Sequence, residues 1–426
     1  MTETRALDEL LADVAKQGKT LTDFLSSNSY YQPAFDGTGF KEYPELPEDV
    51  DNARNRLREA AKAVHDLAAG PKDHLRRHVA SFNDLSTMAY ICYFKVPEAV
   101  PLVGSVSYER VADVCEVDEG QLRRILRYAM TNHFFRETSP DEVAHTAYSS
   151  LLVTDAGERA VVEYSCLDAF PAAAKLAHAC EKWPGAEEAD QTAWSMANHT
   201  ERSYFQHISE PDNKEQMQRF ADAMGAEMSA PEWSIKHTLS GYDWNIVKGS
   251  IVDIGGNQGQ TAIALAREFP DLPQIVVEDL PPVVEPAKTR LPGDIGNRVS
   301  FLAHDFHELQ PAAAASASVF LMRFVLHDHS DKAAVRIVRN ILPALKQGSK
   351  LVVVDIAAPP TGEASALEER AIRSLDIEMM TMLNGKERTV EEWKELFTRA
   401  DGKLSVKNVN LQKGTALGVF EVVYEK

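Results

Sequence analysis

Residues 251–260 read Ile-Val-Asp-Ile-Gly-Gly-Asn-Gln-Gly-Gln, a short run of mostly β-branched residues that ends in a glycine-rich turn. Such a run predicts a buried strand, and the glycines let the backbone turn tightly and approach a ligand without a Cβ between them. The next residues predict a helix, whose first N–H groups can bind an anionic group. A dinucleotide fingerprint starting at Gly255 would require glycine where Asn257 and Gln260 stand. Taken alone, the motif is either a ligand-binding turn or simple packing between a strand and a helix.

The sequence on either side of this turn predicts an α/β domain over residues 246–426. β-branched runs alternate there with helical stretches, which indicates a parallel sheet covered on both faces. The predicted strands cover residues 250–254, 274–277, 299–302, 318–322 and 350–355, and the helices between them include 260–268 and 332–345. Residues 404–411 and 417–424 predict an antiparallel pair at the sheet edge. The expected fold is therefore Rossmann-like with a mixed sheet.

The half of the chain before residue 246 predicts mainly helices, because apolar residues recur there every three or four positions. Residues 1–46 predict a helical arm followed by an irregular, proline- and glycine-containing linker, and 47–245 a helical domain. The arm packs either on its own domain or around a partner subunit. Residues at about 80–150 have the order of a winged helix. Arg123, Arg124 and Arg127 would be its DNA contacts, or else they form a solvated face or contact another subunit.

Composition disfavours the DNA interpretation. The chain has 426 residues, and 45 basic against 64 acidic side chains give a formal charge of -19, which repels phosphate backbones and anionic membranes. Four cysteines without a CxxC pair fit a reducing compartment, and the longest weakly polar stretch, 312–322, is too short to span a bilayer. We therefore expect a cytoplasmic protein that binds neither nucleic acid nor membrane.

Acidic residues follow two successive predicted strands after the glycine turn. Glu278 and Asp279 end the second strand, where a carboxylate can accept hydrogen bonds from ribose hydroxyls. Asp305 and Phe306 follow the third strand, where they can hold the amino group and the face of an adenine. S-adenosylmethionine suits such a crevice, because carboxylates tolerate its sulfonium and the turn amides can bind its own carboxylate.

Five motifs in order resemble those of plant-type O-methyltransferases that use S-adenosylmethionine, and in particular fungal members that methylate polyketide phenols, such as the sterigmatocystin O-methyltransferases. The motifs are Asp253-x-Gly255-x-x-x-Gly259, Glu278-Asp279-Leu280-Pro281, His304-Asp305-Phe306, Leu326-His327-Asp328 and Gly385-Lys386-Glu387-Arg388-Thr389. The resemblance covers about residues 70–425. It implies a class I methyltransferase domain preceded by a winged-helix-containing dimerisation domain, and hence a homodimer.

The resemblance also implies the roles of individual residues. The cofactor-binding positions would be Asp253, Gly255, Gly256, Gly259, Asp279, Leu280, Asp305, Phe306 and Arg323. His327 would be the general base, oriented by Glu387 and by Asp355. A phenol with a pKa of about 10 is a poor nucleophile at neutral pH, and an imidazole with a pKa of about 6.5 can take its proton. We expect no metal, because the histidines at 304, 307, 327 and 329 form no HxxxH pair.

Candidate apolar walls for an aromatic acceptor, lying between the domains, are Trp194, Phe205, Phe220, Met224, Met379, Met380 and Met382. For each of them, ordinary core packing is the interpretation that we favour. Three positions depart from the family pattern: Asn257 replaces a glycine, Asp355 replaces Glu, and His329 replaces the Trp after the His-Asp pair. These departures keep a second hypothesis open, that of a methyltransferase-fold cyclase or pericyclase that binds S-adenosylmethionine without transferring its methyl group.

Overall fold

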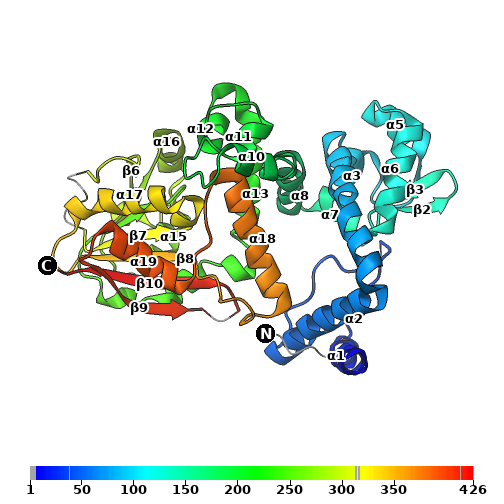
Figure 1. The fold of residues 1–426 in the computed structure, drawn as a ribbon, viewed down its shortest axis with the longest axis horizontal. Coiled ribbons are helices and arrows are strands. Elements are labelled where there is room, and N and C mark those ends of the chain that lie inside the picture. Colours follow the sequence, from blue (N-terminus) through cyan, green and yellow to red (C-terminus); the bar gives the residue numbers. More distant parts are fainter. Residues whose placement is uncertain (1–5, 38, 312–313, 315–316, 413, 426) are drawn as a thin grey trace. The chain divides into compact units, whose positions relative to one another are not determined.

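The computed structural model describes residues 6–37, 39–311, 314, 317–412 and 414–425 (Figure 1). The chain divides into two compact units. One comprises Met1–Pro171 with Glu215–Ala226, and the other comprises Ala172–Lys214 with Glu227–Lys426. Residues 172–214 and 227–245, which the sequence pattern groups with the helical domain, thus belong to the unit that contains the large sheet. In the described part of the chain no helix is long and apolar enough to cross a membrane.

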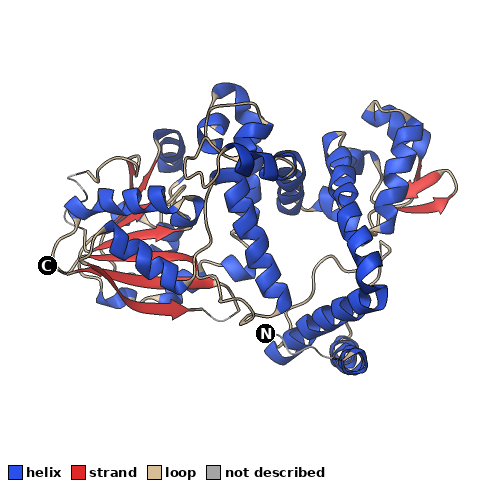
Figure 2. Ribbon diagram, viewed as in Figure 1, coloured by secondary structure: helices blue, strands red, loops and turns tan. Residues whose placement is uncertain are grey.

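The first unit is mainly helical (Figure 2). Its helices are α1 (Leu7–Ser27), α2 (Glu48–Ala80), α3 (Phe82–Tyr93), α4 (Val96–Ala99), α5 (Tyr108–Cys115), α6 (Glu119–Thr131), α7 (Ala147–Thr154), α8 (Ala156–Tyr164), the π-helical turn η1 (Ser165–Ala169) and most of α13 (Lys214–Glu227). Its strands are β1 (Val106–Ser107), β2 (Arg136–Ser139) and β3 (Glu142–Ala144), paired antiparallel in the order β1-β3-β2. The short helix α9 (Phe170–Ala173) runs across the boundary to the second unit.

The N-terminal arm packs within its own unit. Leu21 and Leu25 of α1 are buried together with Val50 of α2, which corresponds to the own-domain alternative. Helix α2 is kinked at Gly70, whose φ of 69° is not helical, and Pro71 follows. Beyond the kink the side chains of α2 are largely exposed.

Helices α5 and α6, followed by the β2–β3 pair, form the expected winged helix. Two of the three predicted arginines pair with acids of the same unit: Arg123 with Glu119 and Asp141, and Arg127 with Glu137. These ion pairs favour the interpretation of a solvated face.

The second unit is built around a seven-stranded sheet in the described part of the chain, with the order β6-β5-β4-β7-β8-β10-β9. The strands are β4 (Ile251–Ile254), β5 (Ile275–Asp279), β6 (Val299–Ala303), β7 (Val319–Arg323), β8 (Lys350–Ile356), β9 (Leu404–Leu411) and β10 (Leu417–Tyr424). The first five are parallel, and β10 runs antiparallel between β8 and β9. The predicted mixed sheet is confirmed, and its strand ends differ from the predicted ones by at most two residues.

Helices cover both faces of this sheet (Figure 1). The helices of the unit are α10 (Leu176–Lys182), α11 (Ala193–Ala197), α12 (Tyr204–Ile208), α14 (Lys236–Gly241), α15 (Gln260–Glu268), α16 (Pro281–Arg290), α17 (Asp331–Ile341), α18 (Ala366–Leu383) and α19 (Val390–Ala400). The short turns are η2 (Pro211–Asn213), η3 (Pro231–Trp233), η4 (Trp244–Ile246), η5 (Gly296–Arg298), η7 (Leu326–Asp328) and η8 (Leu342–Ala344). Helices α17 and α19 bury their apolar residues on one face, and α15 with η4 on the other. Burial on both faces explains why the central strands are mostly apolar, whereas the edge strand β9 carries exposed polar residues.

Candidate active site

The glycine turn between β4 and α15 is closed tightly onto the end of β5. Gly255 has a φ of 67°, and a Cβ there would lie 2.9 Å from Val325 Cγ2. The N–H groups of Gly255 and Gly256 both donate to the Glu278 carbonyl. Asn257, where the family has glycine, adopts a φ of 53°, a left-handed conformation that asparagine tolerates better than most residues. Asparagine is therefore compatible with the backbone conformation of this turn.

Asp253 places a buried carboxyl group beneath this turn. The residue is 1% exposed, and its Oδ2 has no hydrogen-bond partner among the described residues. Burial raises the pKa of Asp253 to about 7, against the lowering influence of Arg323 and with a further increase from Asp279. A buried carboxyl oxygen without a partner is costly, so a donor or cation from a ligand would satisfy it.

Asp279, at the end of β5, is oriented by the backbone. Its Oδ2 accepts a hydrogen bond from Asn257 N at 2.9 Å, and its Oδ1 accepts one from Leu280 N at 2.7 Å. Because a carboxylate has about four acceptor sites, both oxygens can still accept hydroxyl donors. The turn and the carboxylate are thus held in one arrangement, with acceptor sites left for a ligand.

The third strand end carries a cluster of aromatic rings. Asp305 Oδ1 accepts from His307 N at 2.9 Å. The ring of Phe306 lies 4.8 Å from that of His307 and 5.5 Å from that of His329, measured between centroids. Burial, with the nearby positive groups, lowers the pKa of His329 to about 3. His329 is therefore uncharged at neutral pH and preserves an aromatic ring at the position where the family has Trp.

Arg323, at the end of β7, is oriented within the second unit. Its Nη2 donates to the Trp233 carbonyl, and its guanidinium lies 4.8 Å from the centre of the Phe324 ring. Burial lowers the pKa of Arg323, whereas the carboxyl groups of Asp253 and Asp355 oppose this change. The Arg323 guanidinium thus interacts electrostatically with Asp253, beneath the glycine turn, and with Asp355, beside His327.

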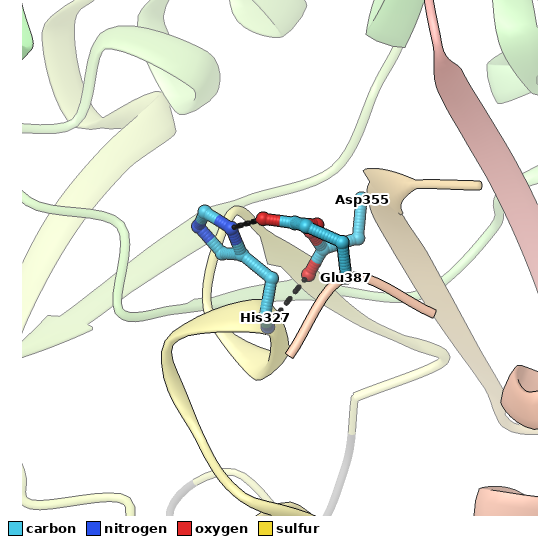
Figure 3. Close-up of side chains that lie close together, drawn as sticks. All are labelled: His327, Asp355 and Glu387. Atoms are coloured by element: carbon cyan, nitrogen blue, oxygen red, sulfur yellow. Dashed lines mark hydrogen bonds and ion pairs between the residues drawn. The ribbon is translucent and has the colours of Figure 1, made fainter. Parts of the chain in front are cut away.

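His327 lies in η7 and is surrounded by carboxyl groups (Figure 3). Its Nδ1 lies 2.9 Å from Glu387 Oε1, and its backbone N–H donates to Asp355 Oδ2 at 3.3 Å. Its Nε2 lies 3.5 Å from Asp328 Oδ1. Because Glu387 can only accept when ionised, Nδ1 carries a proton and Nε2 is the nitrogen available to a substrate.

Opposing influences set the pKa of His327. Burial by itself would lower this pKa, but the carboxyl groups of Asp328, Asp355 and Glu387 outweigh burial and raise it to about 10. Burial raises the pKa of Asp355 to about 6, and it also raises that of Asp328. Glu387 Oε2 has no partner among the described residues. Three carboxyl groups thus surround one imidazole, an arrangement that favours positive charge on this side chain.

Local structure brings Glu387 to His327 from 60 positions away. Helix α18 ends at Leu383 and is followed by Asn384, which adopts a φ of 56°. The chain then runs past η7 before Thr389 caps α19. A Cβ at Gly385 would lie 2.4 Å from the His327 carbonyl oxygen, so the close passage requires glycine. Lys386 N donates to that same oxygen at 2.9 Å.

The expectation of no metal and the acceptor walls both stay predictions. Within the described residues, one donor atom each of His327, Asp355 and Glu387 lie within 4.8 Å of one another, so these three residues, rather than the four histidines, could hold a metal ion. Trp194 is fully buried against Tyr204 and His207, which fits core packing. Of the other predicted walls, Phe220 and Met224 belong to the first unit, and Phe205, Met379, Met380 and Met382 to the second.

The sequence does not indicate the contacts or backbone conformation of three residues in this region. Asp328 and Arg388 stand inside the recognised motifs, but nothing in the motifs shows that Asp328 lies beside Nε2 or that Arg388 binds the His327 loop. Phe324 has a φ of 51°, and its ring lies 5.5 Å from that of His327. A left-handed backbone at a bulky residue has no sequence signal.

Comparisons with known proteins agree with this geometry. The family model of the O-methyltransferase domain matches residues 186–402, and that of the O-methyltransferase dimerisation domain matches residues 77–155. O-methyltransferase pgmB of Aspergillus terreus is 34% identical over 98% of this chain and 95% of its own. The crystal structure of OxaC with SAH and oxaline superimposes with a TM-score of 0.79 at 20% identity, over 99% of this chain and 100% of that one. A structure described as a pericyclic reaction enzyme gives a TM-score of 0.71 at 21% identity, over 98% and 100%.

The fold and the glycine turn define a class I methyltransferase. More specifically, the chain belongs to the O-methyltransferase family and is an enzyme that uses S-adenosylmethionine. The residues present fit this cofactor, because the Asp279 carboxylate is held at the end of β5 with acceptor sites left over, and the unpartnered oxygen of Asp253 lies directly beneath the turn.

Proposed function

We propose that this enzyme methylates a phenolic or enolic hydroxyl group of a fungal-type secondary metabolite, and that His327 takes the proton of that hydroxyl. The observation that carries this proposal is the hydrogen bond between His327 Nδ1 and Glu387 Oε1, which leaves Nε2 for the acceptor. Relatives similar over nearly the whole chain are O-methyltransferases, including pgmB.

When bound, S-adenosylmethionine supplies an electrophilic methyl group on a sulfonium sulfur. Asp279 would hold the ribose, Asp305 and Phe306 the adenine, and Asp253 the polar end of the cofactor. Asp253 and Asp279 have raised pKa values because of burial, so a positively charged ligand is favoured beside them.

Glu387 keeps the imidazole of His327 in one tautomer, and Nε2 then accepts the proton of the acceptor hydroxyl. The pKa of His327, about 10 in the free protein, is close to that of a simple phenol, about 10. Proton transfer between them is therefore nearly thermoneutral. At neutral pH the free protein holds an imidazolium, so the rate with a simple phenol should rise with pH until His327 loses its proton.

Acceptors of different acidity test the role of His327. 2-Naphthol is un-ionised at neutral pH, whereas pentachlorophenol is ionised and needs no base. We expect His327→Ala to lower kcat/KM by roughly 10²- to 10⁴-fold for 2-naphthol but only slightly for pentachlorophenol. Binding of S-adenosylhomocysteine, measured by calorimetry, serves as the control. An equal loss for both acceptors would exclude His327 as the base.

A cyclase or pericyclase is the second candidate, favoured by one observation. A His327 imidazolium at neutral pH can donate from Nε2 and polarise a substrate carbonyl instead of removing a proton. Incubation with methyl-labelled S-adenosylmethionine and a panel of phenolic polyketides and hydroxypyridones separates the two functions. Formation of S-adenosylhomocysteine supports methylation, and isomerisation without it supports the cyclase.

We also infer that the enzyme is a homodimer formed through the first unit. The dimerisation-domain match begins at residue 77. Leu75, Val79 and Phe82, just beyond the kink of α2, are 62%, 60% and 57% exposed. Large apolar side chains exposed in one short segment are typical of an interface.

A further inference from the structure

The loop that carries His327 has little regular structure of its own. Its helical part, η7, spans only Leu326–Asp328, and so short a 3-10 turn has poor hydrogen-bond geometry. The loop connects β7 to α17. The position of His327 must therefore depend on groups outside the loop.

Arg388 is fully buried, and the N–H groups of its guanidinium bind the loop from outside. Its Nη1 donates to the Leu326 carbonyl at 2.9 Å, and its Nη2 donates to the His329 carbonyl at 2.8 Å. These two hydrogen bonds enclose His327 from both sides along the chain. The Nε of Arg388 donates to Asp331 Oδ1 at 2.9 Å, at the start of α17. A lysine ammonium, which is a single point charge, cannot reproduce this fork.

The backbone around Arg388 is itself anchored to the sheet. Ala358 N donates to the Arg388 carbonyl at 2.8 Å, and Ala357 pairs with Arg388 in a parallel bridge directly after β8. The Trp393 ring lies 5.1 Å from the guanidinium carbon. The sheet thus holds the guanidinium, and the guanidinium holds the His327 loop.

We propose that Arg388 is a positioning residue for methyl transfer, which holds the Leu326 and His329 carbonyls so that His327 faces both Glu387 and the acceptor. This inference rests on the proposed role of His327 as the base. Arg388 contacts no reacting atom and acts only through the loop. A displacement of about 1 Å in an active site can lower the rate about a hundredfold, so the effect should be visible in kcat.

Arg399 offers a matched control. Its Nη1 donates to Asp331 Oδ2 at 3.2 Å, and its side chain is 55% exposed, against 0% for Arg388. Both arginines therefore pair with the same carboxylate, and Arg388 also binds the carbonyls of the His327 loop.

The kinetic test compares Arg388→Lys, Arg388→Gln and Arg399→Gln with 2-naphthol and pentachlorophenol as acceptors. We expect kcat with 2-naphthol to fall about tenfold for R388K and about a hundredfold for R388Q, with a smaller loss for pentachlorophenol, which needs no base. R399Q should stay within about twofold of wild type. R388K keeps the buried charge and is the variant to judge if R388Q does not fold. Equal losses for both acceptors, wild-type rates in R388K, or the same loss in R399Q would overturn the proposal.

A spectroscopic test does not depend on turnover. In protein labelled with [13Cε1]histidine, the His327 resonance, assigned with H327Q, reports the pKa of that imidazole. Loss of a positive charge alone would raise this pKa, whereas loss of the contacts with Glu387 and Asp355 lowers it. We expect R388Q, or R388K if R388Q does not fold, to lower the pKa of His327 and R399Q to leave it unchanged. An unchanged or raised pKa would refute positioning, even if no acceptor were methylated. Failure of methylation with a lowered pKa would instead count against the proposed function.

Discussion

Replacement of Asp253 by Asn should make the ligand-free protein more stable at alkaline pH while weakening cofactor binding. Asn has nearly the same shape as Asp but carries no charge. The carboxyl group of Asp253 is buried, and its Oδ2 has no hydrogen-bond partner among the described residues. Burial raises its pKa from 3.8 to about 7, with Asp279 adding to this increase and Arg323 opposing it.

The size of the effect follows from this pKa difference of about 3 units, which corresponds to about 4 kcal/mol at 1.36 kcal/mol per unit. Because the folded-state pKa is raised, the folded protein binds the proton more tightly than the unfolded chain. The stabilisation is complete below the unfolded pKa and is lost as the pH rises through about 7. About 2 kcal/mol of this loss falls between about pH 5.5 and about pH 8.5. D253N lacks the titrating carboxyl group and should not show this loss of stability.

The measurement is urea unfolding of wild type, D253N and Asp271→Asn at these two pH values without cofactor. Asp271 is exposed in the same unit, and its substitution should change stability by less than about 0.5 kcal/mol at either pH. Calorimetry with S-adenosylhomocysteine should show weaker binding to D253N. A stability difference between D253N and wild type that is the same at both pH values would refute the argument.

Three further outcomes are expected. Glu387→Gln should lower kcat by roughly 10²- to 10⁴-fold. It should also move the ascending limb of the pH–rate profile to lower pH, because His327 loses a carboxylate that raises its pKa. An ascending limb at the wild-type pH would contradict this prediction. Asn257→Gly should leave S-adenosylhomocysteine affinity within about threefold, because the bond to Asp279 comes from the backbone N–H; a gain above about tenfold would show that the side chain matters. Val79→Lys combined with Phe82→Lys should yield a monomer by light scattering, whereas Val103→Lys, at an even more exposed apolar site, should not.

The sequence by itself determined the parts of this protein that depend on local patterns. Alternating apolar runs and helical stretches are enough to predict the mixed sheet and its antiparallel edge, because periodicity follows directly from burial on one or both faces. The glycine turn at 255–259 and the acids that end two strands are predictable for the same reason, since parallel strands align their ends. The motif resemblance then assigned His327 and Glu387 as partners, and the 2.9 Å contact between them agrees with that assignment.

Only the tertiary structure decided what joins distant segments. No local pattern shows that Arg388 binds the carbonyls of Leu326 and His329, or that Asp328 lies beside Nε2 of His327. Residues 172–214 likewise belong to the sheet unit, although their helical periodicity matches that of the first unit. Hydrogen bonds to backbone carbonyls and pKa values set by burial depend on the paths of loops between elements. Those paths are determined by packing of the whole unit, so these contacts leave no signature in the residues that make them.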